Sequence, residues 1–178
     1  VESSPGELEQ LGRDILISVT AFVRDRTAFD ALDGAINKLI QDAGREPIRV
    51  WVAGCATGEE AYSIALMIAE AKRRHGETGR VVQIFATDID EDALEIARRG
   101  RYIAAALEAL PPEWVARYFT AAEHTFDVNK ELRDMVVFAK HNLVDDPPFL
   151  RLNLVTCRNV LIYFDNELQS RVLQRFHF

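Results

Sequence analysis

The residues best suited to chemistry lie in a short turn between an apolar segment and an amphipathic one. Residues 48–53 are mostly apolar and β-branched, and they lead into Gly54, Gly58, Glu59 and Glu60. A strand that ends in a glycine turn and opens a helix forms the cofactor crevice of a doubly wound α/β sheet. Here the spacing is Gly-x-x-x-Gly, and two carboxylates at the helix N-terminus would repel a pyrophosphate. The turn therefore favours a cofactor with a positive group, such as the amine and sulfonium of S-adenosylmethionine.

A second apolar segment, residues 81–87, ends in Asp88. A carboxylate at the tip of such a strand can accept hydrogen bonds from both hydroxyls of a ribose. An acidic residue after a strand is often only a helix cap. Because Asp88 follows the glycine turn by one β-α unit, we favour the cofactor-binding interpretation.

Composition excludes several classes of function. The 178 residues are 48% hydrophobic and 28% charged, which fits one α/β domain with a small appendage. A net charge of −7 argues against a nucleic-acid partner. No apolar run reaches the roughly 20 residues of a membrane span and no signal peptide heads the chain, so we expect a cytoplasmic protein without direct membrane insertion. The cysteines, Cys55 and Cys157, are expected to be reduced, and the four histidines lack metal-ligand spacing.

Apolar periodicity predicts alternating helices and strands after a helical N-terminal segment. Strands are expected at residues 49–53, 81–87 and 152–156, and helices near residues 28–40, after Gly58, at 91–99, at 112–119 and after Asp165. Residues 124–128 and 135–140 read as the two strands of a small antiparallel hairpin inserted in the main fold.

Three sequence blocks together resemble one known family. They are residues 19–25 (Val-Thr-Ala-Phe-Val-Arg-Asp), 54–63 (Gly-Cys-Ala-Thr-Gly-Glu-Glu-Ala-Tyr-Ser) and 157–164 (Cys-Arg-Asn-Val-Leu-Ile-Tyr-Phe), with 88–90 and 141–143 between them in the expected order. The chain resembles, over about residues 11–178, the catalytic domain of CheR-type chemoreceptor glutamate O-methyltransferases, in the version found in fused CheB/CheR regulators.

The resemblance implies a Rossmann-like class I S-adenosylmethionine-dependent methyltransferase sheet. It divides the chain into an N-terminal helical segment at 1–45 and a methyltransferase domain at 46–178, with a β insertion at about 120–140. Such a sheet normally closes with two further strands, and none follow the last predicted helix, so we expect the last two strands to be lacking. An open apolar edge invites pairing, which makes self-association through it a hypothesis.

The resemblance also implies a set of cofactor-binding residues: Ser18, Thr20, Arg24, Gly54, Glu60, Asp88, Asn142, Leu143, Arg158 and Asn159. According to the resemblance, Glu60 faces the methionine end of the cofactor, Asn142 forms a hydrogen bond with the adenine and Leu143 packs against the adenine. Ser18 stands where the family has Asn, and its hydroxyl lacks the amide's full set of hydrogen bonds.

Arg24, Arg158 and Tyr163 are the residues to which the resemblance gives catalytic roles. Arg24 would bind a carboxylate, and the Tyr163 hydroxyl would orient the acceptor. Each has an ordinary alternative, since an arginine is commonly a surface residue and a tyrosine a partly buried core residue. A glutamate acceptor has a pKa of about 4.3 and is ionised at neutral pH, so the transfer needs no general base.

The sequence thus predicts S-adenosylmethionine-dependent methylation of glutamate side chains on chemoreceptors or a related signalling protein, with S-adenosylhomocysteine as product. The expected partners are the cytoplasmic helices of such receptors. An alternative is a catalytically weak S-adenosylmethionine-binding regulatory module. A small-molecule methyltransferase is less consistent with the Cys-Arg-Asn block, and the two glutamates of the turn disfavour a nicotinamide-dependent dehydrogenase.

Overall fold

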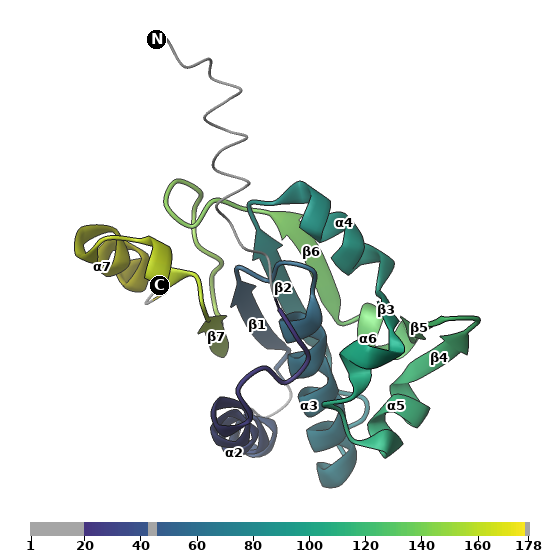
Figure 1. Ribbon diagram of the computed structural model, residues 1–178. Helices are drawn as coiled ribbons and strands as arrows, with labels where there is room; N and C mark the ends of the chain where they lie inside the picture. The colour runs from purple at the N-terminus through teal and green to yellow at the C-terminus, as the bar shows by residue number, and fades with distance from the viewer. Residues whose placement is uncertain (1–19, 43–45, 177–178) are drawn as a thin grey trace, which may run out of the picture.

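The central element is a four-stranded parallel sheet, seen in a computed structural model that describes residues 20–42 and 46–176 (Figure 1). The strands run in the order β6-β2-β1-β7, and every pairing is parallel. Their bounds are Ile48–Ala53 for β1, Val82–Asp88 for β2, Val136–Lys140 for β6 and Leu154–Cys157 for β7. The predicted α/β class with a parallel sheet is confirmed, and the carboxyl ends of β1, β2 and β7 meet at one edge.

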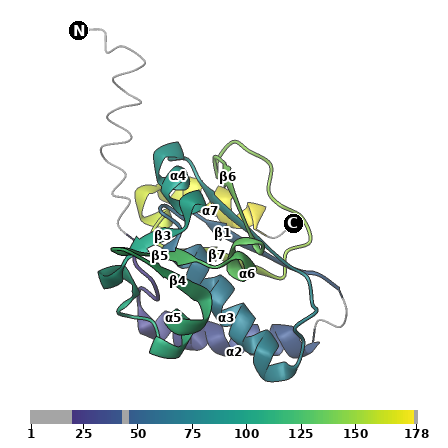
Figure 2. The ribbon, with the colours of Figure 1, turned by 90° about the vertical axis from the view of Figure 1, so that its right-hand side faces the viewer.

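The helices lie on both sides of this sheet. They are α2 (Arg26–Asp42), α3 (Glu59–His75), α4 (Glu91–Arg99), α5 (Pro112–Tyr118), α6 (Lys130–Arg133) and α7 (Asn166–Arg175), with short 3-10 turns η1 (Ala104–Leu107) and η2 (Leu161–Tyr163). Figures 1 and 2 show α7 apart from α2, α3 and α5, across the sheet.

Side-chain alternation in β1 divides the core into two clusters. Val50 and Val52 pack with α3 in the larger cluster, whereas Trp51 and Ala53 pack with Val172 of α7 in the smaller one. Successive side chains of a strand point to opposite faces, so an almost continuously apolar strand must be covered on both sides. The sheet is therefore buried between α3 and α7.

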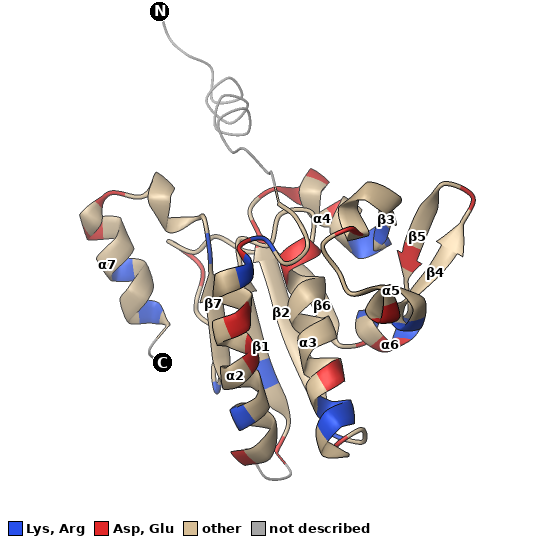
Figure 3. Ribbon diagram, turned by 60° about the horizontal axis from the view of Figure 1, so that its bottom comes forward, with Lys and Arg blue, Asp and Glu red and all other residues tan. Residues whose placement is uncertain are grey.

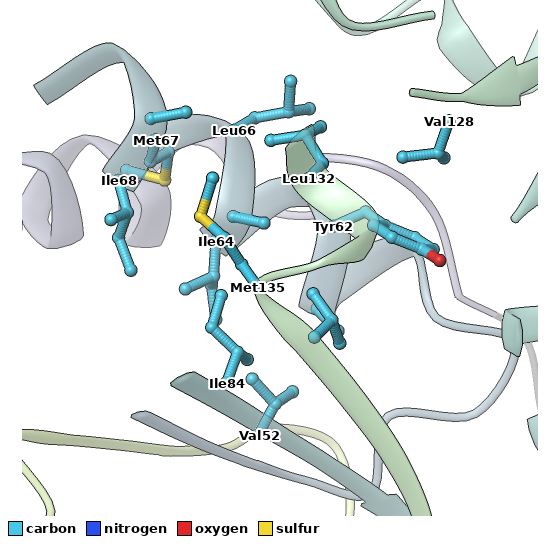
Figure 4. Packing of buried hydrophobic residues seen from close by; sticks show 14 of the residues in the cluster. Val52, Tyr62, Ile64, Leu66, Met67, Ile68, Ile84, Val128, Leu132 and Met135 are labelled. Carbon is cyan, nitrogen blue, oxygen red and sulfur yellow. The ribbon is translucent and has the colours of Figure 1, made fainter. Parts of the chain in front are cut away.

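Helix α3 lies at the centre of the larger cluster, where Figure 4 shows its apolar side chains against those of β1, β2 and α6. Every residue from 61 to 71 is buried, so the helix contacts protein on all sides along this stretch. Its last turn is basic, and Gly76 ends it in a left-handed conformation (φ 72°), donating to the carbonyls of Lys72 and Arg73.

Aspartate side chains cap the first turns of α7, α4 and α2. The Asp165 side chain accepts from Leu168 N at the start of α7, and the Asp90 side chain caps α4. Asp25 Oδ1 accepts from Ala28 N at the start of α2. Gly100 ends α4 at a φ of 60°.

The antiparallel insertion differs from the prediction. It has three strands in the order β3-β5-β4. Their bounds are Arg101–Ile103 for β3, Phe119–Ala122 for β4 and Thr125–Val128 for β5. The hairpin partner predicted at 135–140 is wrong, because these residues form β6, which pairs with β2 in the parallel sheet. A short run of alternating residues cannot reveal its partner, and Val136 and Phe138 pack in the larger core cluster.

One buried carboxylate anchors this insertion to α3. Glu70 is 4% exposed and accepts hydrogen bonds from Arg73, Arg117 and the Tyr118 hydroxyl, the last at 2.9 Å. Burial raises the pKa of Glu70, but the hydrogen bonds outweigh this effect and leave its pKa below the ordinary value. Charged Glu70 thus fixes α5 against α3.

We expect Glu70→Gln to lower the free energy of unfolding by about 1–3 kcal/mol at neutral pH, because charge-assisted hydrogen bonds to two arginines are weakened. Since the folded-state pKa is depressed, the contribution is present above the unfolded pKa and is lost as pH falls through the folded one. Urea unfolding of both proteins at neutral and acidic pH measures this contribution to the free energy of unfolding. Glu95→Gln, which removes an exposed pair with Arg99, is the control and should change stability little; equal losses in the two variants would contradict the prediction.

Candidate functional site

The turn after β1 is tied to the tip of β2 by hydrogen bonds. Gly54 N and Cys55 N both donate to the Thr87 carbonyl, at 2.8 and 2.9 Å. The Asp88 carboxylate accepts from Ala56 N through Oδ2 at 2.7 Å and from Asp90 N through Oδ1 at 3.0 Å. Each carboxylate oxygen keeps further lone-pair capacity. Asp88 therefore orders the turn, and its remaining capacity suits hydroxyl donors.

Both glycines of the turn are required by the packing around it. Gly54 has a φ of 76°, and a Cβ there would lie 2.1 Å from Val160 Cγ2. Gly58 has a φ of 94°, and a Cβ there would lie 2.8 Å from Ala97 Cβ. Left-handed backbone and close approach both favour glycine. At Gly54 the close neighbour is Val160, from the segment after β7.

The two glutamates at the start of α3 have different surroundings. Glu59 is 9% exposed and accepts a 2.6 Å hydrogen bond from the Thr57 hydroxyl, so it belongs to the turn. The Glu60 side chain is 13% exposed, and its Oε2 lies 3.5 Å from Arg158 Nη1. Its other oxygen, Oε1, is buried without a hydrogen-bond partner. Glu60 therefore presents an unsatisfied acceptor at the carboxyl end of the sheet.

Burial raises the pKa of Glu60, and the Thr156 hydroxyl, Arg158 and Arg24 act against this effect. Burial likewise raises the pKa of Glu59. A buried carboxylate with a raised pKa beside a positive partner is typical of a functional site.

Arg158 joins three segments that are distant in the sequence. Its Nη2 donates to the Arg24 carbonyl at 2.7 Å and lies 3.6 Å from Asp25 Oδ2, and its guanidinium lies 5.2 Å from the centre of the Phe29 ring. Figure 3 shows basic and acidic segments near one another at the start of α2, the start of α3 and the end of β7. The predicted residues Arg24, Glu60 and Arg158 are thus brought together.

The loop after β6 is folded around Asn142. Its Oδ1 accepts from Val144 N at 2.9 Å, its Nδ2 donates to Asp145 at 2.7 Å, and its backbone N donates to Asp146 at 2.7 Å. Leu143 is 9% exposed and packs in the smaller core cluster. The side chain of Asn142 therefore shapes the loop, and Leu143 is largely a core residue.

Four predicted residues are less closely tied to this cluster. Ser18 lies outside the described residues. Thr20, the first residue that the structure describes, is half-buried. Asn159 is exposed and has a φ of 58°. Tyr163 is 45% exposed in η2, and the contacts of Glu60 and Arg158 described above do not include it. Their roles stay predictions.

Three residues of the site were not identified from the sequence. Asp25 and Phe29 contact Arg158, and Thr156 stands beside Glu60. A usable signal existed for Thr156, which is a polar residue inside an apolar strand and two positions before Arg158.

The Cys55 thiol donates a weak hydrogen bond to the Ala56 carbonyl, with the sulfur 3.8 Å from the oxygen. Cys55 and Cys157 are free, and burial raises the pKa of both, that of Cys157 to about 12. Neither is therefore an activated nucleophile. Within the described residues, no group of three or more His, Cys, Asp or Glu side chains could hold a metal ion. No helix in that part of the chain is both long and apolar enough to span a membrane.

A family model described as "CheR methyltransferase, SAM binding domain" matches residues 18–178. The chain belongs to the CheR family. The resemblance inferred from the three sequence blocks is confirmed.

Relatives of this CheR domain include two named for chemotaxis. Chemotaxis protein methyltransferase 2 of Pseudomonas aeruginosa is 35% identical over 98% of this chain and 63% of its own length, and the chemotaxis protein methyltransferase of Borreliella burgdorferi is 34% identical over 99% and 65%. A 104.1 kDa protein in the hypE 3′ region of Rhodobacter capsulatus is 44% identical over 97% of this chain and 18% of its own length. The chain spans less than two thirds of each.

One solved structure that is similar to this chain is magnesium protoporphyrin IX methyltransferase from Synechocystis PCC 6803, with bound SAH. The similarity covers 96% of this chain and 61% of the length of that protein, with 17% sequence identity and a TM-score of 0.44.

The site fits the cofactor that the family description names. S-adenosylmethionine carries an amine that is a strong hydrogen-bond donor, and Glu60 Oε1 is a buried acceptor without a partner. A buried orphan acceptor is costly unless a ligand satisfies it. The acidic turn thus complements a cationic cofactor.

We expect Glu60→Gln to raise the stability of the unliganded protein at neutral pH, on the order of 1 kcal/mol, because it removes a buried charge that burial disfavours. In thermal denaturation this corresponds to an increase of about 2–4 °C.

The stability difference between Glu60→Gln and the wild type should shrink as pH falls. Since the folded-state pKa of Glu60 is raised, the folded protein binds this proton more tightly than the unfolded chain and gains stability on acidification. A variant that melts below the wild type at neutral pH would contradict the prediction.

Proposed function

We propose that this chain is the cofactor-binding and catalytic part of an S-adenosylmethionine-dependent protein-glutamate O-methyltransferase, acting on chemoreceptors or a related signalling protein. The observation that carries the proposal is the buried Glu60 carboxylate, with one unpartnered oxygen, at the acidic turn of a CheR-family sheet. The names of the two chemotaxis relatives support the substrate class.

The residues that would hold the cofactor lie at or after the ends of the four strands β1, β2, β6 and β7. Glu60 would accept from its amine and Asp88 from its ribose hydroxyls. Asn142 and Leu143, after β6, would border the adenine, and Asn159 and Gly54 would line the crevice. Thr20 and Ser18 would contribute from the N-terminal side. When bound, S-adenosylmethionine supplies the methyl group.

The chain's own contribution to catalysis is orientation and charge. The acceptor glutamate is already ionised, so nothing must remove a proton. Arg24 and Arg158 lie at the rim of the site and would attract and orient the acceptor carboxylate, and Tyr163 would fix its position. Orientation and exclusion of water can contribute roughly 7–11 kcal/mol.

A protein with a net charge of −7 does not attract an acidic substrate over its whole surface. The positive groups at the site, Arg24, Arg26 and Arg158, would therefore act locally. We propose the cytoplasmic helices of chemoreceptors as the partner. Self-association through β7, the last strand in the described part of the chain, remains a hypothesis.

Titration of S-adenosylhomocysteine by calorimetry tests the cofactor site. We expect binding by the wild type and a loss of at least about tenfold in affinity for Asp88→Asn, because an amide is a poorer partner for two hydroxyl donors than a carboxylate.

Asp88→Ala is the less specific variant, since it also removes both hydrogen bonds that order the turn. It should lower stability by about 2–3 kcal/mol, more than Asp88→Asn does, because Asn retains an oxygen acceptor. Wild-type affinity in Asp88→Asn would contradict the assignment of Asp88.

Methyl transfer to a helical receptor fragment tests the activity. A product that releases methanol in base is a carboxyl methyl ester, which distinguishes glutamate from nitrogen acceptors. We expect Tyr163→Phe to lower kcat by about tenfold while the Kd of S-adenosylhomocysteine stays unchanged, because the variant removes only the hydroxyl that would position the acceptor, from a side chain that is 45% exposed. An unchanged kcat would remove Tyr163 from the catalytic set.

A further inference from the structure

Strand β7 carries a buried polar side chain whose hydrogen-bonding capacity is unused. Thr156 is 9% exposed and pairs with Val52 of β1, and its hydroxyl has no hydrogen-bond partner. A buried group left in this state costs about 1–3 kcal/mol. Thr156 is also the one polar residue among the apolar side chains and the thiol of Leu154–Cys157. Its presence in the strand therefore needs an explanation beyond packing.

Side-chain alternation shows which face Thr156 belongs to. Leu154 packs in the cluster that contains α3, whereas Val155 and Cys157 pack in the cluster that contains Val172 of α7. Thr156 therefore points to the α3 side of the sheet. Glu60, in the first turn of α3, lies on the same side, and the Thr156 hydroxyl opposes the rise that burial causes in the pKa of Glu60, although no hydrogen bond joins the two side chains.

Arg158, two residues further on, reaches the same carboxylate, with its Nη1 lying 3.5 Å from Glu60 Oε2. A hydroxyl and a guanidinium two positions apart thus face one buried acceptor, and Glu60 Oε1 remains unsatisfied.

We propose that Thr156 is a positioning residue for the cofactor amine: a rotation of its side chain lets the hydroxyl, which is unpartnered in this structure, donate to the Glu60 carboxylate and, with Arg158, hold it with one oxygen directed at the bound amine. The inference rests on the proposed function, because it requires that Glu60 receives the cofactor. A carboxylate fixed by two donors loses less conformational freedom when the amine binds, and this raises affinity.

The alternative role of Thr156 is purely structural, since a β-branched residue is favoured in any strand. Thr156→Val keeps the branching and nearly the same volume and removes only the hydroxyl. Thr156→Ser keeps the hydroxyl and removes the branching. The two variants therefore separate the hydrogen bond from the packing.

Calorimetry with two ligands tests the proposal. S-adenosylhomocysteine carries the amine, and 5′-methylthioadenosine lacks the whole amino-acid part. We expect Thr156→Val to weaken S-adenosylhomocysteine about tenfold, or about 1.4 kcal/mol, and to leave methylthioadenosine unchanged. Thr156→Ser should bind S-adenosylhomocysteine nearly as the wild type does. In a Glu60→Gln background, Thr156→Val should have no further effect.

Equal weakening of both ligands by Thr156→Val would show that Thr156 only shapes the strand, and unchanged binding of S-adenosylhomocysteine would show that the hydroxyl is irrelevant. Either result overturns the proposal while wild-type binding leaves the proposed function intact. A wild type that binds neither ligand would instead overturn the proposed function, and this inference with it.

A measurement without ligand is independent of the cofactor. Carbon-13 NMR of the Glu60 carboxyl gives its pKa, which should be higher in Thr156→Val than in the wild type. The other groups that act on Glu60 or are acted on by it, Arg24, Arg158, Cys55 and Cys157, are the same in both proteins. An unchanged titration of Glu60 would overturn the contact between the two residues.

Discussion

The burial of one carboxylate, that of Glu60, is the constraint on which the rest of the site depends. A charge taken out of water must be compensated by nearby donors. The Thr156 hydroxyl and then Arg158 oppose the effect of burial on the pKa of Glu60, and the Arg158 guanidinium also contacts the Arg24 carbonyl, Asp25 and Phe29. The segment that leads into α2 is thereby held against the ends of β7 and α3. The ion pair between Glu60 and Arg158 is thus also the contact that closes this side of the crevice.

The turn after β1 contains an unfavourable backbone conformation, which hydrogen bonds help to stabilise. Ala56 has a φ of 45°, a left-handed conformation that is unfavourable for a residue with a Cβ. Its backbone N–H is the group that Asp88 Oδ2 accepts at 2.7 Å. Asp88 thus stabilises the strained turn and is also the proposed ribose acceptor. Structure and function therefore depend on the same carboxylate, and Asp88→Asn, which retains one oxygen acceptor, disturbs the turn less than Asp88→Ala does.

The sequence was most informative where the structure is local. The β1-turn-α3-β2 unit follows from apolar runs, two glycines and Asp88, all near one another in the chain. The strands β3 and β4 were missed because three and four residues are too few for periodicity to detect. β6 was recognised as a strand, but its partner is set by tertiary packing. For the same reason the pairing of Glu60 with Arg158 was not predicted, although the family resemblance put both residues in one site, and Thr156 was not recognised at all.

The charges of the site suit a reaction between a cation and an anion in an acidic protein. A glutamate acceptor is repelled by the net charge of −7, so it can be received only where positive groups dominate locally. The Arg158 side chain is 23% exposed and lies near Glu60 and Asp25, whereas Arg24 is exposed. Exposure makes Arg24 better placed to meet the acceptor, and burial makes Arg158 better placed to hold Glu60 ionised. In the proposed function the negative group would therefore lie inside, for the cofactor amine, and Arg24 would lie outside it, for the acceptor carboxylate.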